Sequence, residues 1–293
     1  MLQSARLLIC KLKLTAPSNE RLRTTGKGPP SMNVSTLGTW RNPPLAYVVA
    51  ELAISPYYSL AAKIPDLQDR LRIAYPRTVE TQELLMDIGK PTPTAQNIWQ
   101  LLSADQRHGV QFSTRSISIH ATSYATSSDL LTRWAEVLDA IQASGLNAFV
   151  ERAGLRYVDL IVPNNKLQPA DYVSQQLQGI TPTGSRSTGA MWAAAFQFDS
   201  AVVNLRVGAP APSGILLPPN FNALPLQKPQ VMLDAEARLK DAQPIGFIDT
   251  DCLKEVGQVF NAAALVSIYT EMQKLASQSF KAALSEVARK EWV

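Results

Sequence analysis

The stretch Glu151–Val162 reads Glu-Arg-Ala-Gly-Leu-Arg-Tyr-Val-Asp-Leu-Ile-Val and predicts a long β-strand that ends at a proline. Side chains alternate between the two faces of a strand, so Arg152, Gly154 and Arg156 should share one face. Tyr157 should lie on the opposite face. Gly154 leaves space between the two guanidinium groups.

This strand carries the candidate ligand-binding residues, which are Arg152, Arg156 and Tyr157. Two arginines separated by a small residue could clamp a carboxylate or a phosphate. The alternative is a structural role, in which the arginines pair with Glu51 or Glu151 and lock the sheet together. The sequence leaves both interpretations open.

Short strands surround this one in the first half of the chain. Residues 110–121 predict a hairpin, and Thr126 with Asp129 forms a capping-box pattern that predicts the start of a helix ending at Gly145. Further strands are expected at residues 45–54, 77–88 and 95–102, with short helices at 59–72 and 169–178.

The second half repeats the order of strands followed by helix. Residues 181–187 are rich in Pro, Gly and hydroxyl residues and mark the best candidate boundary. The expected elements beyond it are a hairpin at 190–207, a Pro-rich loop at 209–229, a strand at 231–238 and a long helix from about 253 to 289.

The predicted fold class is therefore α+β, with two mainly antiparallel subdomains, each followed by helix, and a long C-terminal helix. The subdomains would comprise residues 32–180 and 181–293. Residues 1–31 should form an unstructured extension, and Met32 is the preferred start of the protein.

The positive charge of the chain is concentrated at its beginning. Residues 1–31 hold 6 of the 28 basic and 1 of the 24 acidic side chains, so residues 32–293 carry 22 basic and 23 acidic ones. A body close to neutrality has no general field to attract a polyanion. We therefore expect no nucleic-acid partner for residues 32–293.

Cysteine usage indicates a reducing compartment. Cys10 lies in the extension, which leaves Cys252 without a partner for a disulfide in residues 32–293. No run of about 18 apolar residues occurs, so no membrane-spanning helix is expected. These features predict a cytoplasmic protein without a membrane partner.

Candidate catalytic groups are few. His108 and His120 lie in or beside the 110–121 hairpin, and His120 is expected to be a solvated strand residue, with its neighbour Ser118 about 7 Å away. Nucleophilic catalysis needs hydrogen-bond contact and a third orienting group, so we assign no catalytic residue. No cofactor is expected, because no phosphate-binding glycine motif occurs.

Two pairs of acidic residues provide a weaker alternative. Asp234 and Glu236 are alternate residues of a predicted strand, and Asp249 and Asp251 have the same spacing before the final helix. Paired carboxylates could hold Mg²⁺ for phosphoryl chemistry. Alternatively, the first pair belongs to a polar strand face, and Asp249 or Asp251 caps the helix.

Four landmarks give the sequence a resemblance to a sporadically distributed bacterial protein family of uncharacterised function. They are an opening strand at Pro44-Leu45, Tyr75-Pro76, the Arg-x-Gly-Leu-Arg-Tyr strand at 152–157, and a long final helix. The chain departs from the family pattern at Asp159, where Asn is usual, and it lacks a His near the start of the final helix. The resemblance implies a binding or regulatory role.

Together these observations predict a non-catalytic protein-interaction or regulatory protein. The resemblance further implies a partner in a mobile bacterial defence or toxin–antitoxin-like locus. The expected partner is another protein, and a homo-oligomer or an edge strand offered to another molecule is also compatible with the sequence. Two alternatives remain, a metal-dependent phosphodiesterase or nuclease and a sensor of a small anionic ligand.

Overall fold

The computed structural model describes most of the chain after its first 43 residues. The described ranges are 44–85, 94–123, 126–164, 166–180, 182–185, 187–211 and 224–292. The predictions for residues 1–31, for the end of the strand at 77–88 and for much of the loop at 209–229 lie outside these ranges.

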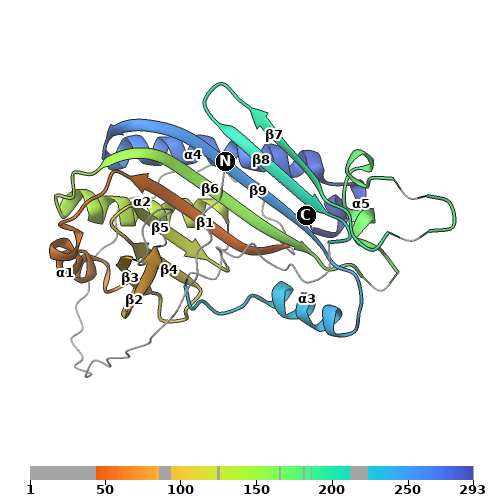
Figure 1. Ribbon diagram of the computed structural model, residues 1–293, viewed down its shortest axis with the longest axis horizontal. Helices are drawn as coiled ribbons and strands as arrows, with labels where there is room; N and C mark the ends of the chain where they lie inside the picture. Colours follow the sequence, from red (N-terminus) through yellow and green to blue (C-terminus); the bar gives the residue numbers. More distant parts are fainter. Residues whose placement is uncertain are drawn as a thin grey trace.

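The described strands form one antiparallel sheet of nine, in the order β2-β3-β4-β5-β1-β6-β9-β8-β7 (Figure 1). Neighbours along the sequence mostly pair as hairpins, whereas β6 and β9 join the two halves of the chain. The strands are β1 (Leu45–Ile54), β2 (Arg77–Leu85), β3 (Thr94–Leu102), β4 (His108–Phe112), β5 (Ser116–Ala121), β6 (Phe149–Ile161), β7 (Trp192–Gln197), β8 (Val202–Gly208) and β9 (Gly246–Val259).

Helices pack mainly on one face of this sheet. The α-helices are α1 (Leu60–Leu71), α2 (Ser127–Ala143), α3 (Gln230–Lys240), α4 (Ala262–Ala283) and α5 (Glu286–Trp292), and 3-10 turns occupy Pro169–Tyr172 and Gln175–Leu177. The long helices α2 and α4 lie side by side across the central strands, as Figure 1 shows. No helix of the described ranges is both long and apolar enough to cross a membrane.

The main core lies between the sheet and helices α2 and α4. Trp134 of α2 and Tyr269 of α4 meet edge-on with ring centroids 5.6 Å apart, and both are fully buried. The Tyr269 hydroxyl donates a hydrogen bond to the backbone oxygen of Glu51 at 2.6 Å. This bond ties α4 directly to the central strand β1.

Several predicted elements are confirmed, including their end signals. Thr126 caps α2, where its hydroxyl accepts a hydrogen bond from the Asp129 amide at 3.2 Å. Gly145 follows the helix with a φ of +68°, a conformation that glycine adopts without strain. In the second hairpin, the Phe198 amide donates to the Ala201 oxygen, so the strands turn at residues 199 and 200.

Three predicted elements are wrong. Residues 231–238 belong to helix α3, because Met232 and Ala235 form a buried stripe at helical spacing. The final helix begins at Ala262 rather than near Leu253, since residues 246–259 pair with strands on both sides as β9. The region 169–178 contains two 3-10 turns instead of one helix.

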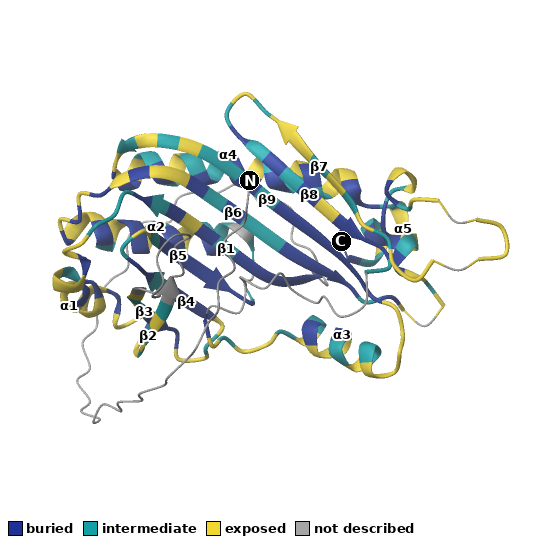
Figure 2. Cartoon of the chain, in the orientation of Figure 1, coloured by how far each residue is buried: buried dark blue, intermediate teal, exposed yellow. Residues whose placement is uncertain are grey.

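The α+β class is confirmed, whereas the division into two subdomains is not. The pairing of β6 with β9 makes one continuous sheet from strands on both sides of the proposed boundary at residues 181–187. Figure 2 shows that buried residues continue across this junction through β1, β6 and β9.

The other face of the sheet is more polar, and we call it the polar face. Helix α3 covers one end of it, where Met232 and Ala235 pack on Leu160 and Phe247. The segment 224–229 crosses a neighbouring part, as Leu226 packs near Tyr47 and Val158. The rest of the polar face holds most of the residues singled out from the sequence.

Candidate functional site

The polar face carries the two predicted arginines. Arg152, Gly154 and Arg156 share it, as the alternation of β6 predicts, and Arg156 lies opposite Asp251 of β9. Tyr157 lies on the helix-covered face, where it packs against the main core. The three candidate ligand residues are therefore divided between the two faces of the sheet.

Arg156 forms a bidentate ion pair with Asp249. The Arg156 Nε and Nη2 atoms donate to the two carboxylate oxygens, each at 2.7 Å. Only 12% of the Arg156 side chain and 3% of the Asp249 side chain are exposed. Arg206 of β8 adds a longer contact of 3.5 Å to Asp249. This geometry is typical of a strong internal pair and supports a structural role for Arg156.

Asp251 and Arg152 flank this pair. Burial raises the pKa of Asp251, and the nearby Arg156 guanidinium partly offsets that rise. Arg152 is exposed, opposite Glu255 of β9. The candidate arginines and one pair of the candidate acids thus form a single mixed-charge cluster.

The other acidic pair lies on α3. Asp234 accepts a hydrogen bond from Gln230 at 2.8 Å, and Glu236 pairs with Lys228. Both contacts are local to this helix and the turn before it. Within the described ranges, no group of three or more His, Cys, Asp or Glu residues is arranged to hold a metal ion.

His120 is buried, so the expectation of a solvated histidine is wrong. The ring lies between Ser118 Oγ, 2.7 Å from Nε2, and Tyr47 OH, 3.0 Å from Nδ1. Although alternate strand residues are about 7 Å apart at the backbone, their side chains bend together here. Burial lowers the pKa of His120 to about 3, which keeps the ring neutral at physiological pH. Ser118 is also buried, with an exposed fraction of 4%. The hydrogen-bonded row Ser118–His120–Tyr47 therefore joins β5 to β1 out of contact with solvent.

A second group of polar side chains is buried on the helix-covered face. Tyr157 lies directly opposite Thr250, and neither hydroxyl has a hydrogen-bond partner among the described residues. Asp159 is the next residue of β6 on this face, and burial raises the pKa of its carboxyl to about 8. This carboxyl is therefore mostly protonated at neutral pH.

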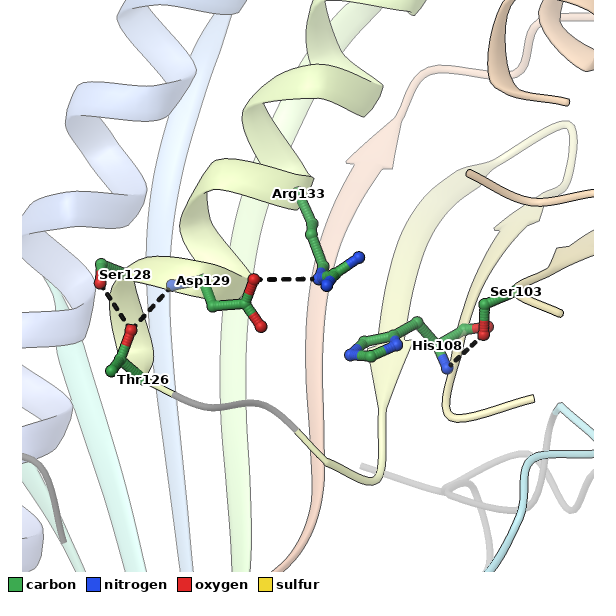
Figure 3. Close-up of polar contacts among 6 residues, drawn as sticks. All are labelled: Ser103, His108, Thr126, Ser128, Asp129 and Arg133. Atoms are coloured by element: carbon green, nitrogen blue, oxygen red, sulfur yellow. Dashed lines mark hydrogen bonds and ion pairs between the residues drawn. The ribbon is translucent and has the colours of Figure 1, made fainter. Parts of the chain in front are cut away.

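His108 faces the first turn of α2 (Figure 3). Burial and the nearby Arg133 guanidinium lower the pKa of His108. Arg133 Nε donates to Asp129 at 3.2 Å, and the His108 amide donates to Ser103 at 3.1 Å. Arg133 is thus paired with a carboxylate of its own helix, and its influence on His108 is electrostatic.

One end strand of the described sheet has no further described strand paired to its outer side. β7, with the sequence Trp-Ala-Ala-Ala-Phe-Gln, is the last strand in the described sheet and is largely exposed (Figure 2). The Phe198–Ala201 hydrogen bond belongs to the ladder between β7 and β8. Because every second residue of an antiparallel strand bonds to a given neighbour, Trp192, Ala194 and Phe196 are the residues of β7 that bond to β8. The amides and carbonyls of Ala193, Ala195 and Gln197 consequently point away from β8.

A groove runs between this strand and α4. Its volume is about 310 Å³, and none of the described residues that line it is charged. Trp192 and Phe196 stack at 6.2 Å along its β7 side. The lining residues are Ser174, Gln176, Leu177, Trp192, Phe196, Phe198, Leu205, Gln278, Ser279, Ala282 and Ala283. We call the outward backbone of residues 193–197 together with this groove the β7 edge.

Sequence reasoning identified the β7 hairpin but not its position at the end of the sheet. The signal was the absence of charge and proline from residues 192–197, which is unusual for an edge strand. No protein-family model matches the chain, and no curated protein matches it in sequence.

A first prediction concerns the buried ion pair. Arg156→Gln should lower the free energy of unfolding by about 3 kcal/mol, because it leaves the Asp249 carboxylate buried without its main partner. Arg152→Gln, on the same face but exposed, is the matched control and should change stability by less than about 0.5 kcal/mol. Urea unfolding of the two variants measures the difference. Equal stability of both variants would contradict a structural role for Arg156.

A second prediction concerns Asp159. Between about pH 4 and pH 8 its carboxyl is protonated in the folded state and ionised in the unfolded state. The folded state thus binds more protons, and this group lowers stability as the pH rises through that window. Asp159→Asn should become progressively more stable than the wild type from pH 4 to pH 8 in urea unfolding. Parallel pH profiles would contradict the assigned protonation.

Proposed function

We propose that this chain is a non-catalytic protein-interaction protein that binds another polypeptide by strand addition at the β7 edge. The observation that carries the proposal is an end strand that no other described strand pairs with on its outer side, and whose outward backbone groups border an uncharged, aromatic-lined groove. Strand addition supplies affinity through backbone hydrogen bonds and specificity through pockets for alternate side chains.

The two ends of the sheet differ in a way that supports this choice. The opposite edge strand, β2, contains Arg77, Glu80 and Glu83, and charges of this kind discourage pairing with other chains. β7 contains neither a charged residue nor a proline. The charges of β2 therefore discourage pairing with another chain at that edge of the described sheet, whereas β7 carries no such charge.

The groove suggests the chemistry of the partner. Trp192, Phe196 and Phe198 provide aromatic surface, and the polar groups around them are uncharged. Aromatic side chains are enriched among the residues that contribute most to protein interfaces. The bound segment should therefore be extended, with apolar side chains on the face turned toward α4.

The mixed-charge cluster favours this function over the two alternatives. A nuclease using Asp249 and Asp251, or an anion sensor using Arg156, would have to dissociate the bidentate pair. Removing one member of a buried pair leaves the other charge uncompensated. Binding of a polypeptide at the β7 edge leaves the Arg156–Asp249 pair intact.

The biological setting follows from the sequence and is part of the proposal. We place the protein in the cytoplasm of a bacterium, as a member of the sporadically distributed family and as a regulatory partner in a mobile defence or toxin–antitoxin-like locus. Residues 32–180 and 181–293 would act as two subdomains joined by the β6–β9 pairing.

Affinity purification from the native host tests the proposed function. Tagged wild-type protein should co-purify one polypeptide in near-equal amount, identified by mass spectrometry. Ala195→Pro should abolish this binding, since it removes an outward N–H yet leaves the bonds to β8 intact. Ala195→Ser keeps the N–H and is the matched control. Equal recovery with Ala195→Pro, or no co-purifying polypeptide with the wild type when the host's untagged copy of this chain is counted, would contradict the proposal.

A further inference from the structure

We propose that the polypeptide bound at the β7 edge is β7 of a second copy of this chain, related to the first by a two-fold axis through Ala194. This inference rests on the proposed function, because it names the partner of the same edge. It predicts a continuous antiparallel sheet that runs through both subunits.

The sequence of β7 is chemically symmetric about Ala194. Trp192 and Phe196 are two residues before and after it, and Ala193 and Ala195 are its direct neighbours. An antiparallel two-fold pairing places a residue before the axis opposite the partner-subunit residue that is equally far after it, so Trp192 faces Phe196 of the partner subunit. The pattern aromatic, alanine, alanine, alanine, aromatic is therefore complementary to itself.

The backbone groups fit the same register. Ala193 and Ala195 both direct their amide and carbonyl groups outward, as the alternation from the Phe198–Ala201 bond requires. With Ala194 on the axis, Ala193 lies opposite Ala195 of the partner subunit, and both have outward-directed amide and carbonyl groups. The two strands can therefore form backbone hydrogen bonds with each other in this register.

The side chains fit this register as well. On the groove side, Trp192 would lie opposite Phe196 of the partner subunit in a non-hydrogen-bonded pair, where side chains approach most closely. Aromatic cross-strand pairs of this kind stabilise antiparallel sheets. The two-fold axis generates this pair of Trp192 with Phe196 of the partner subunit twice, and the small side chain of Ala194 leaves room between the two pairs.

Charge does not oppose the association. β7 is uncharged, as is the lining of the groove beside it, so the two copies bring no like charges into direct contact along the paired strands. The exposed fraction of Phe196 is 40% and that of Met191 is 52%, which is apolar surface that pairing would cover. A second copy is therefore a partner whose chemistry this edge matches.

Single cysteines test the register in the full-length chain, in a Cys10→Ser background where Cys252 is fully buried. Ala194→Cys should form a disulfide-linked dimer under mild oxidation, since non-bonded strand pairs have Cα atoms about 4.5 Å apart. Ala195→Cys alone should not, whereas a mixture of Ala193→Cys and Ala195→Cys proteins should. Crosslinking of Ala195→Cys alone would overturn the proposed register.

Sedimentation velocity of the purified protein tests the dimer itself. The wild type should sediment as a dimer, and Ala195→Pro and Ala195→Lys, with circular dichroism to verify folding, should sediment as monomers. A dimer that persists in both variants would overturn the inference, because it would use another surface. A wild-type monomer at all concentrations would also overturn it, but the proposed function would stand if the host purification still yields a polypeptide sensitive to Ala195→Pro.

Discussion

The antiparallel pairing of β6 with β9 is the interaction on which the rest of the structure depends. These two strands have 13 and 14 residues, and their ladder runs from Phe149–Val259 to Ile161–Gly246. It joins strands from the two halves of the sequence and provides the surface on which α4 packs. A contact between residues so distant in sequence is costly in chain entropy. Burial of the helix-covered face, and of both faces near the Ile161–Gly246 end, offsets that cost.

The two faces of this ladder are stabilised by different interactions. The helix-covered face is apolar near α2 and α4, and it tolerates a few buried polar groups such as Asp159. The polar face uses charge to fix the strands, with Arg156 of β6 joined to Asp249 of β9. A register that separated Arg156 from Asp249 would leave buried charges without partners, so this pair disfavours a shift of β6 against β9. The backbone groups of the central strands are thus used by internal pairing, and unpaired backbone groups of the described sheet lie at its two end strands, of which β7 is the one without charged residues.

Local signals in the sequence predicted the local elements. The Thr126 cap, Gly145 and the turn at residues 199 and 200 each depend on a few neighbouring residues, and each is confirmed. The strand β9 was missed because its pairing partners are distant in sequence, while residues 231–238 read equally well as strand or helix until the packing of Met232 is known. For the site, the sequence provided Arg156 and Asp249 separately. Only the register of β6 with β9 brings them together.

Amide hydrogen exchange at Ala195 tests the central claim most directly. Within one copy, the Ala194 amide is bonded to β8, whereas the Ala195 amide points outward from the described sheet. If the β7 edge is an interaction surface for a second copy, exchange at Ala195 should slow markedly as protein concentration rises, while exchange at Ala194 stays slow throughout. Fast exchange at Ala195 at every concentration would contradict the account.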